Sequence, residues 1–531
     1  MTRKWWQWCL IIGLCATAQA GCAQLPQPGP RPAVQALSAE AAARTPLGQL
    51  SAGMAPEPGI SGFRLLVAGQ DALDTLLALA DNARQTLDLQ YYLIHGDDSS
   101  RTIMRHVRAA ADRGVRVRLL LDDLNTAGQD QGLMALTRHP RIEVRLYNPL
   151  PTGRLHIGTR LLASLTDLKR INHRMHNKMF VADNAMAVTG GRNLGDAYFL
   201  RDTDSNFLDI DVLAAGPAVQ SLSRTFDRFW NDPLAYPVSA VVDEPATPTS
   251  AERLPTPASA ALMGASAPSS PQGATRPPPW PPQTRAEQPR LDAHKLRLEW
   301  VRAHVLADKP SKLRSGGDPA PHEKIDDDIE RMLKATQREL LIISPYFVPG
   351  EHGMSLLRTL RQRGVDVRVL TNSLATTDAP AVHTGYARYR VPLLQDGVRL
   401  FELRPDLGHI PDKRVSIGSM GSSRASLHAK VFVIDQATAV VGSMNLDPRS
   451  RNLNSEMGVV MRSPVLARQL KDVFEAVSAR SYALSLGPDQ RLQWKTLPPD
   501  PKLEEAWEPG AGFWLKMGIR LLSPFAPEEM L

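Results

Sequence analysis

Two stretches of the chain carry the same reactive side chains at the same spacing. In each, a His is followed two residues later by a Lys and five residues after that by an Asp, and a turn of small residues and an Asn come next. The residues are His176, Lys178, Asp183 and Asn193 in the first copy and His428, Lys430, Asp435 and Asn445 in the second. Because side chains alternate along an extended segment, each His lies on the same side as its Lys.

This set of side chains suits chemistry on a phosphodiester. Such a group repels nucleophiles and has a poor leaving group, so its cleavage needs a nucleophile, a proton donor and positive charge around the phosphate oxygens. One imidazole can attack phosphorus to form a phosphohistidine, while the other, protonated, gives its proton to the departing oxygen. Lys178, Lys430, Asn193 and Asn445 would hold the charged oxygens. No cofactor or metal is needed; a zinc site on the two His is a weaker alternative, because the paired Lys would repel the ion.

A carboxylate on the other ring nitrogen would fix the tautomer of a nucleophilic His and raise its basicity. Alignment of residues 216–219 with 463–466 places Asp209 opposite Glu456. These two are the candidates, with Asp211 as the rival in the first copy. The Asp of each motif ends an apolar strand and is predicted to fasten the turn that follows.

Other His residues lack such neighbours in the sequence. We predict that they are structural or exposed. They are His95, His106, His173 and His383.

The segments around the two motifs repeat one order of helices and strands. In the first half, the apolar pattern predicts helices over 71–84 and 100–113 and strands over 86–92, 115–121 and 142–146. In the second half, it predicts strands over 340–346, 365–370 and 398–403 and a helix over 355–363. A Gly at the helix exit before the next strand is typical of parallel α/β layering. The sequence therefore predicts an α/β fold with two duplicated lobes.

Length and composition set the domain organisation. The chain has 531 residues, 43% of them hydrophobic, and a net charge of +7, which allows a large core and favours contact with nucleic acid or an anionic membrane. We predict a first lobe over 59–243 and a second over 297–480. A disordered insert rich in Pro and Ala, 244–296, lies between them, and a C-terminal tail, 481–531, follows.

The beginning of the chain is typical of an export signal. Arg3 and Lys4 precede an apolar run over 9–18 that is too short to span a bilayer, which predicts a signal peptide over 1–21. Ala-Gly-Cys at its end is similar to a bacterial lipobox and predicts acylation of Cys22; cleavage after Ala20 is the alternative. Residues 22–58 are predicted to be a flexible tether. All three Cys fall within the first 22 residues, so the folded body has no disulfide or thiolate metal site.

The doubled motif with its trailing Asn resembles the phospholipase D superfamily. Further stretches are similar to its bacterial cardiolipin synthase branch, in particular the C type. They are residues 89–92, 121–123, 190–199, 209–212 and 344–349. The resemblance extends over about 59–480. It implies two α/β/α lobes packed together, with one active site at the seam and one His from each lobe.

The resemblance also implies an activity. A phosphatidyl group would pass from one phospholipid to a hydroxyl of phosphatidylglycerol, making cardiolipin, with His176 as the nucleophile and His428 as the acid. The expected partners are phosphatidylglycerol, phosphatidylethanolamine as a further donor, and a membrane surface; a small helper protein is left open and no nucleic acid is expected. The alternatives are a phospholipid hydrolase and, less favoured, an exported nuclease.

The chain departs from the family at its N-terminus. Cardiolipin synthases commonly have two membrane helices there, whereas this sequence has none. Attachment would then rest on Cys22, giving an exported lipoprotein facing the periplasm, or on surface contacts. Residues 513–522, with Lys516 and Arg520 one turn apart among apolar residues, are one such contact, or they dock on the protein itself.

Overall fold

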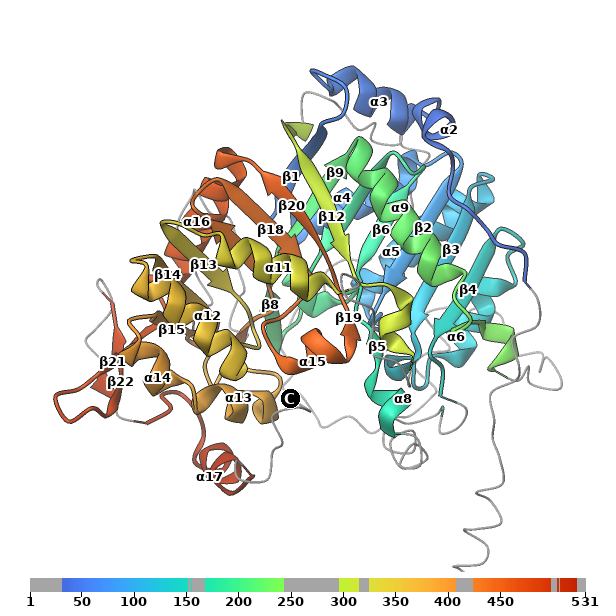
Figure 1. The fold of residues 1–531 in the computed structure, drawn as a ribbon. Helices are drawn as coiled ribbons and strands as arrows, with labels where there is room; N and C mark the ends of the chain where they lie inside the picture. Colours follow the sequence, from blue (N-terminus) through green and yellow to red (C-terminus); the bar gives the residue numbers. More distant parts are fainter. Residues whose placement is uncertain are drawn as a thin grey trace, which may run out of the picture.

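Two mixed β-sheets form the centre of the molecule (Figure 1). The computed structural model describes residues 31–150, 154, 168–242, 296–314, 324–406, 424–497, 504–505 and 507–522. The predicted signal peptide, Cys22 and almost all of the predicted insert lie outside the described residues. Both copies of the repeated motif lie within them.

The first sheet has the strand order β10-β4-β3-β2-β6-β7-β9-β1-β11. Its strands are β1 (Ser61–Leu66), β2 (Thr86–Tyr91), β3 (Arg116–Asp122), β4 (Ile142–Tyr147), β6 (Met179–Ala182), β7 (Met186–Gly190), β9 (Asp211–Ala215), β10 (Ala235–Pro237) and β11 (Glu299–Val301). Strands β2, β3 and β4 are parallel, and the remaining pairs are antiparallel.

The second sheet has the order β12-β20-β18-β17-β13-β14-β15-β21-β22-β23. Its strands are β12 (Ala303–Ala307), β13 (Glu339–Ile343), β14 (Asp366–Asn372), β15 (Arg399–Leu403), β17 (Val431–Ile434), β18 (Thr438–Gly442), β20 (Met457–Arg462), β21 (Tyr482–Leu486), β22 (Leu492–Thr496) and β23 (Glu504–Glu505). The run from β15 to β12 repeats the run from β4 to β1, including the parallel triplet β13, β14, β15. The predicted α/β duplication is therefore confirmed.

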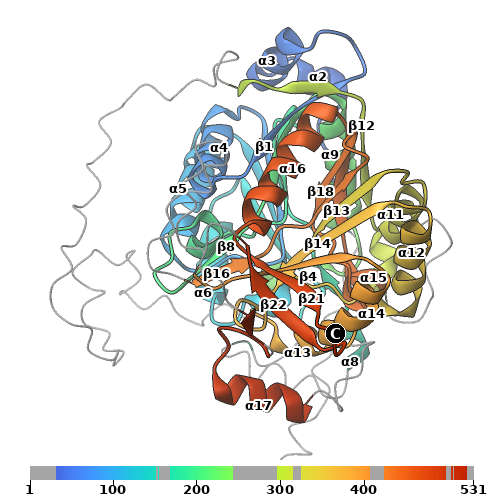
Figure 2. The ribbon, with the colours of Figure 1, turned by 90° about the vertical axis from the view of Figure 1, so that its left-hand side faces the viewer.

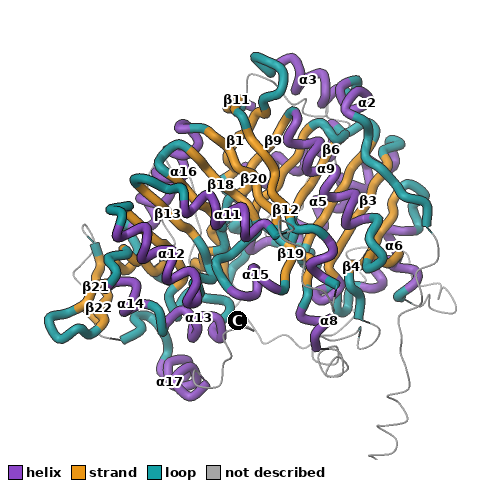
Figure 3. Tube along the Cα trace, in the orientation of Figure 1, coloured by secondary structure: helices purple, strands orange, loops and turns teal. Residues whose placement is uncertain are grey.

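Helices cover both faces of the sheets (Figure 3). They include α4 (Gly69–Asn82), α5 (Asp98–Asp112) and α9 (Pro217–Trp230) in the first lobe, and α11 (Ile325–Lys334), α12 (Gly350–Gln362) and α16 (Pro464–Ser478) in the second. Each lobe has a separate core, one under α4 and α5 and the other under α11 and α12. The opposite faces of both sheets, with α9 and α16, share a third core that crosses the seam. Apolar burial thus fixes the two lobes against each other.

Local signals set the ends of these helices. The Asp97 side chain caps α5 by accepting from the backbone N–H of Ser100 at 3.1 Å. Gly114 and Gly364 follow α5 and α12 with φ of 101° and 82°, a left-handed conformation that favours glycine and turns the chain into β3 and β14. The same glycine turn thus leads from a helix into a parallel strand in both lobes, as the predicted α/β layering requires.

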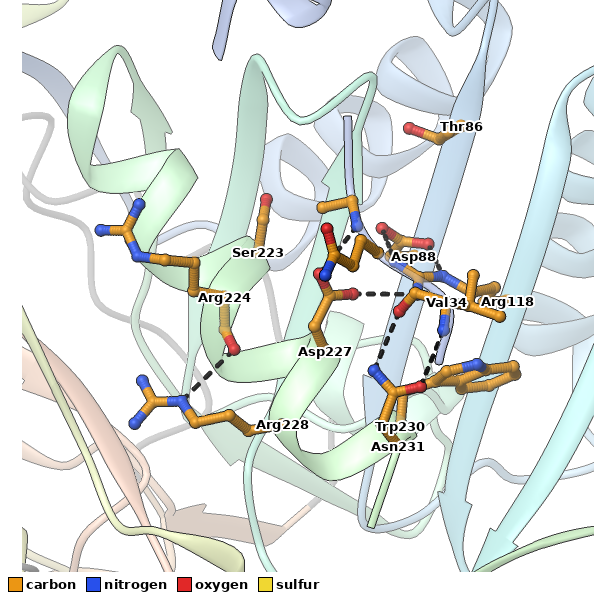
Figure 4. A network of polar contacts seen from close by, with 12 residues as sticks. Val34, Thr86, Asp88, Arg118, Ser223, Arg224, Asp227, Arg228, Trp230 and Asn231 are labelled. Carbon is orange, nitrogen blue, oxygen red and sulfur yellow. Dashed lines mark hydrogen bonds and ion pairs between the residues drawn. The ribbon is translucent and has the colours of Figure 1, made fainter. Parts of the chain in front are cut away.

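The described residues of the predicted tether that precede α2 (Ala39–Ala43) are bound to the first lobe. The guanidinium of Arg118 lies buried between Asp88, at 2.7 and 2.8 Å, and Asp227, at 2.9 Å (Figure 4). Beside it, the amide of Asn231 bonds the backbone of Val34 in both directions, at 2.9 and 3.0 Å. Two short helices follow, α2 (Ala39–Ala43) and α3 (Pro46–Met54).

Residues 31–58 therefore differ from the predicted flexible tether. Ser38 and Thr45 cap the two helices with their side chains, and Leu47 is buried in the core of the first lobe. Pro46 at the first position of α3 adds a favourable start. Short capped helices with few apolar positions carry little periodicity, which is why the apolar pattern missed them.

The lobe boundaries also differ from the prediction. Leu296 and β11 belong to the first lobe, where Val301 pairs with Ser61. Ala303, two residues later, pairs with Met461 in the second sheet. The chain therefore passes between sheets at residue 302, and the predicted insert leaves and re-enters the first lobe. The predicted tail also contributes structure, because β21, β22 and β23 extend the second sheet.

The last described element is α17 (Phe513–Leu522), which packs beside α13 (Pro380–Ala387) and projects from the molecule in both ribbon views (Figures 1 and 2). Among the helices of the described ranges, none is long and apolar enough to cross a bilayer.

Candidate active site

The first motif His is held by a carboxylate from the second lobe. Nδ1 of His176 lies 2.9 Å from Oε2 and 3.1 Å from Oε1 of Glu456. The Glu456 side chain is fully buried, whereas that of His176 keeps 10% of its surface exposed. With Nδ1–H donating to the carboxylate, the other nitrogen, Nε2, carries the free lone pair.

The second motif His is held by a carboxylate from the first lobe. Nδ1 of His428 lies 2.6 Å from Oδ2 of Asp209. Asp209 is fully buried, and the His428 side chain is 7% exposed. Each of the two carboxylates predicted to orient a His therefore lies within hydrogen-bond distance of one, and each reaches across the seam to the other lobe.

Two short parallel ladders produce this exchange. One joins β5 (Arg174–Met175) to β19 (Asn454–Ser455), and the other joins β8 (Ser205–Leu208) to β16 (Arg424–Leu427). Each ladder ends immediately before a His on one strand and a carboxylate residue on the other. The N–H of His176 donates to the carbonyl of Ser455 at 3.0 Å, and that of His428 donates to the carbonyl of Leu208 at 2.8 Å. Strand register thus places each ring beside its carboxylate.

Burial and positive charge dominate the electrostatics of the His pair. Burial, followed by Lys178, Lys430, His428 and further cations, holds the pKa of His176 well below its usual value. Burial and then Lys430 also lower the pKa of His428, but Asp209 opposes them. Since Lys430 and His428 of the second lobe lower the pKa of His176 in the first, and Lys430 also lowers that of Lys178, the four side chains form one site.

The two orienting carboxylates differ in charge state. Burial raises the pKa of Glu456 to about 7 against the opposing effect of Lys178. Burial alone would also raise the pKa of Asp209, but His428 and Lys430 outweigh it and the pKa is lowered. At neutral pH, His428 therefore faces an ionised Asp209, whereas His176 faces a Glu456 carboxyl that is close to half-protonated. The site is nearly symmetric in geometry and asymmetric in charge.

The motif Lys and Asn residues lie in the same site. Nζ of Lys178 donates to the carbonyl of His176 at 2.8 Å, and Nζ of Lys430 lies 3.0 Å from Nδ1 of His428. Burial lowers the pKa of Lys178 to about 7. The side-chain oxygens of Asn193 and Asn445 are buried without a hydrogen-bond partner among the described residues. Because the oxygen and nitrogen of an amide are assigned from the network, each Asn has a buried polar atom available to a ligand.

The remaining acidic candidates lie outside the chemistry. Asp211, the rival to Asp209, pairs with Arg192 at 3.3 Å and does not contact a His ring. Asp183 accepts from the backbone N–H groups of residues 84, 85 and 86 at 3.0, 2.7 and 3.0 Å. Asp435 does the same for residues 337–339. The prediction that these two fasten the following turn is thus corrected: each fastens the entry of the neighbouring strand, because its carboxylate points across the sheet.

Aromatic rings and one cation complete the site, and the sequence did not assign them. Tyr92 meets the ring of His176 edge-on at 5.0 Å, and Tyr198 meets that of His428 at 5.3 Å. Phe207 lies 5.3 Å from His428. Arg449 adds positive charge near His176. The adjacent tyrosines at 91 and 92 could have indicated an aromatic wall of the site, but a buried strand would also contain such residues.

Four other His residues were predicted to be structural or exposed. His106 lies 2.7 Å from a carboxylate oxygen of Asp81 and His383 lies 3.4 Å from one of Glu508, so both contact carboxylates outside the motifs. His95 lies against Tyr198, with ring centroids 6.3 Å apart. His173 is half-buried just before β5. The described residues contain no group of three or more His, Cys, Asp or Glu side chains placed to hold a metal ion.

The turn after the first motif leaves no room for a side chain. A Cβ at Gly191 would lie 2.2 Å from Oδ1 of Asp209. Gly191→Ala is expected to displace this carboxylate and the ring of His428, lowering kcat by roughly 100-fold with little change in secondary structure. Steady-state kinetics and circular dichroism measure both. Gly132→Ala is the control because nothing lies within 4 Å of its Cβ. A wild-type kcat in Gly191→Ala would contradict the assigned role of this turn.

Comparisons with known proteins agree with the geometry. A family model described as "Cardiolipin synthase, PLD-like domain" matches residues 76–230 and 329–478. Cardiolipin synthase C of Escherichia coli K12 is 37% identical over 489 residues, covering 89% of this chain and 97% of that protein. A cardiolipin synthase of Staphylococcus aureus Mu50 is 23% identical, covering 78% of this chain and 66% of that protein.

Solved structures agree at the level of the fold. Phosphatidylserine synthase of Haemophilus influenzae Rd KW20 aligns with 91% of this chain and 100% of its own, with a TM-score of 0.55 and 13% identity. At this identity the match supports the bilobal fold alone.

Proposed function

Since the chain belongs to the cardiolipin synthase family of phospholipase D-like enzymes, which are phosphatidyltransferases, we propose that it makes cardiolipin by transferring a phosphatidyl group to phosphatidylglycerol. The observation that carries this proposal is the exchange of carboxylates. Each imidazole is fixed at Nδ1 by the other lobe, so both can present Nε2 to one phosphodiester.

In the first step, Nε2 of His176 attacks phosphorus and the bond from phosphorus to the headgroup oxygen breaks. His428, protonated at Nε2, gives its proton to that oxygen, so the headgroup leaves as glycerol or ethanolamine according to the donor. The motif Lys and Asn side chains stabilise the charge on the phosphate oxygens. The product is a phosphohistidine on His176.

In the second step, the neutral His428 takes the proton from a hydroxyl of phosphatidylglycerol. The hydroxyl oxygen attacks phosphorus, the phosphorus–nitrogen bond breaks and His176 is released. The assignment of nucleophile and acid is supported by the charge asymmetry. The pKa of His176 is the more strongly lowered, which suits a neutral nucleophile, and the ionised Asp209 favours the protonated form of His428.

The proposal includes attachment to a membrane. Acylation of Cys22 would anchor an exported protein facing the periplasm and hold the site near its substrates. Support comes from the sequence around Cys22. A lipid-anchored enzyme would meet donor and acceptor in the same bilayer.

Lipid extracts from a host without cardiolipin test this function. Cells expressing the wild type are expected to accumulate cardiolipin, and cells expressing His176→Ala or His428→Ala are not. Accumulation of phosphatidic acid in place of cardiolipin would instead identify a hydrolase that uses water. Equal cardiolipin content in all three strains would refute the synthase, and DNA cleavage lost in both variants would favour a nuclease.

A further inference from the structure

Helix α17 carries an apolar surface that the described protein leaves uncovered. The residues Phe513, Trp514 and Leu521 are 64%, 83% and 67% exposed, and nearby Trp507 is 44% exposed. Large aromatic side chains at such exposure are unusual on a soluble surface and mark an interaction site when they cluster. Phe513 and Trp514 are in contact, with ring centroids 5.4 Å apart.

The helix has the amphipathic pattern of a membrane-surface element. Phe513, Met517 and Leu521 recur every four residues and therefore form one stripe, with Trp514 at its edge. Lys516 and Arg520, also four residues apart, run along the side of this stripe. Apolar and aromatic residues flanked by cations suit the boundary between acyl chains and anionic headgroups.

The helix is held firmly in place by the residues before it. Glu508 is buried and bonds the guanidinium of Arg390, with Nη2 at 3.3 Å, and it lies 3.4 Å from His383 on α13. Lys516 donates to the carbonyl of Trp507 at 3.0 Å and lies 5.4 Å from the centroid of its ring. The apolar stripe is thus displayed from a fixed position.

That position is beside α13, which follows the loop of residues 373–379, here called the rim of the active site. Asp378 in this loop accepts from the hydroxyl of Tyr346 at 2.8 Å, and its charge partly opposes the lowering of the pKa of His428 and Lys430 that burial causes. Since α17 packs beside α13, it lies next to this rim. In two perpendicular views α17 lies at the end of the molecule that also carries α13 and α8 (Leu168–Asn172) (Figures 1 and 2).

We propose that α17 docks on an anionic lipid bilayer and, with its apolar stripe in the interface, holds the rim of the active site against the membrane. The inference rests on the proposed function for its choice of lipid as the partner. It resolves the two roles considered for residues 513–522: the helix docks on its own lobe and presents the remaining apolar side chains outward.

Vesicle binding tests the proposal. The mature chain carrying Cys22→Ser, which has no thiol to acylate, is sedimented with vesicles of phosphatidylglycerol and phosphatidylethanolamine, or of phosphatidylcholine alone. Phe513→Ala/Trp514→Ala/Leu521→Ala is expected to weaken binding to the anionic vesicles at least about tenfold. Lys516→Gln/Arg520→Gln is expected to weaken binding only to the anionic vesicles. Val465→Ala, which shortens an apolar side chain 45% exposed on α16, is the control and should bind as the parent does.

Transfer measured in detergent micelles separates this inference from the proposed function. The triple variant should keep the parental rate in micelles, because no catalytic residue is changed, and should lose rate on vesicles. If the parent makes no cardiolipin in micelles, the proposed function fails while the binding result still stands. Undiminished vesicle binding by the triple variant would overturn the inference. The inference would also be overturned if light scattering found the parent to be a dimer and the triple variant a monomer while both bound vesicles equally. That result would assign the stripe to a contact with a second copy of the chain.

Discussion

With a lipid whose headgroup leaves without needing a proton, such as a p-nitrophenyl phosphatidyl ester, His428→Gln is expected to release one equivalent of headgroup and then stop. Departure of nitrophenolate needs no acid, so His176 can still attack phosphorus. The second step then fails because no base takes the proton from the acceptor hydroxyl. His176→Gln is expected to release no burst. On natural lipids both variants should lose at least about 10²- to 10⁴-fold in rate, the range for loss of a general acid or base.

Stopped-flow absorbance and intact-mass spectrometry measure the burst and the added phosphatidyl mass. Gln is chosen because its amide can donate to the buried carboxylate, which Ala would leave unpaired. His352→Gln is a matched control, since its side chain is 53% exposed in a surface ion pair. A burst in His176→Gln, or a label on the peptide containing residue 428, would reverse the assignment of nucleophile and acid.

Exchanging each buried carboxylate for its amide is expected to produce large losses that differ in their pH dependence. Asp209→Asn removes the charge that opposes burial and Lys430, so the pKa of His428 falls further and less of it is protonated at neutral pH. The expected loss in kcat is roughly 10³- to 10⁴-fold, as for other oriented His residues. The activity that remains should fall as pH rises, because the acid is lost at a lower pH.

Glu456→Gln should instead change the part of the pH–rate profile in which the rate rises with pH. The pKa of Glu456 is raised to about 7, so below that pH its carboxyl loses the negative charge that strengthens the bond from Nδ1–H and raises the basicity of His176. Wild-type rate should therefore rise with pH through about 7, and this rise should disappear in Glu456→Gln. Profiles of kcat/KM measure both effects, with Asp112→Asn, an exposed carboxylate, as the control. A rise near neutral pH that persists in Glu456→Gln would exclude Glu456 as its origin.

The sequence was sufficient for those features that depend on local pattern. The strands and helices around both motifs were predicted because apolar residues repeat at the period of each element, and the second lobe repeated the evidence of the first. Asp209 and Glu456 were found in the same way, by aligning the two copies. Which His each one serves could not be predicted, because the pairing depends on the rotation of one lobe against the other across the seam.

Features without a repeated or periodic signal were missed or misplaced. Thr45 and Pro46 indicate a helix start, but the helix they begin has too few apolar positions to stand out from a linker. Arg118 and Asn231 bond the backbone of Val34 ahead of α2 and α3, and nothing in the sequence around either residue indicates that contact. Nor could the sequence show that the chain changes lobe at residue 302, since β11 and β12 form an almost continuous extended run.

That crossing at residue 302 has a consequence for how substrates are exchanged. The two lobes are joined by the chain at residue 302, by the ladders β5–β19 and β8–β16, which cross the seam, and by a core that spans it. Separating the lobes during turnover would break these two cross-seam ladders and expose that core. We therefore expect donor lipid, departing alcohol and acceptor to enter and leave the site without separation of the lobes. In the proposed mechanism, the ratio of transfer to hydrolysis would then depend on whether the acceptor hydroxyl or water reaches the phosphorylated His176 after the headgroup leaves, and not on a domain motion that closes the site.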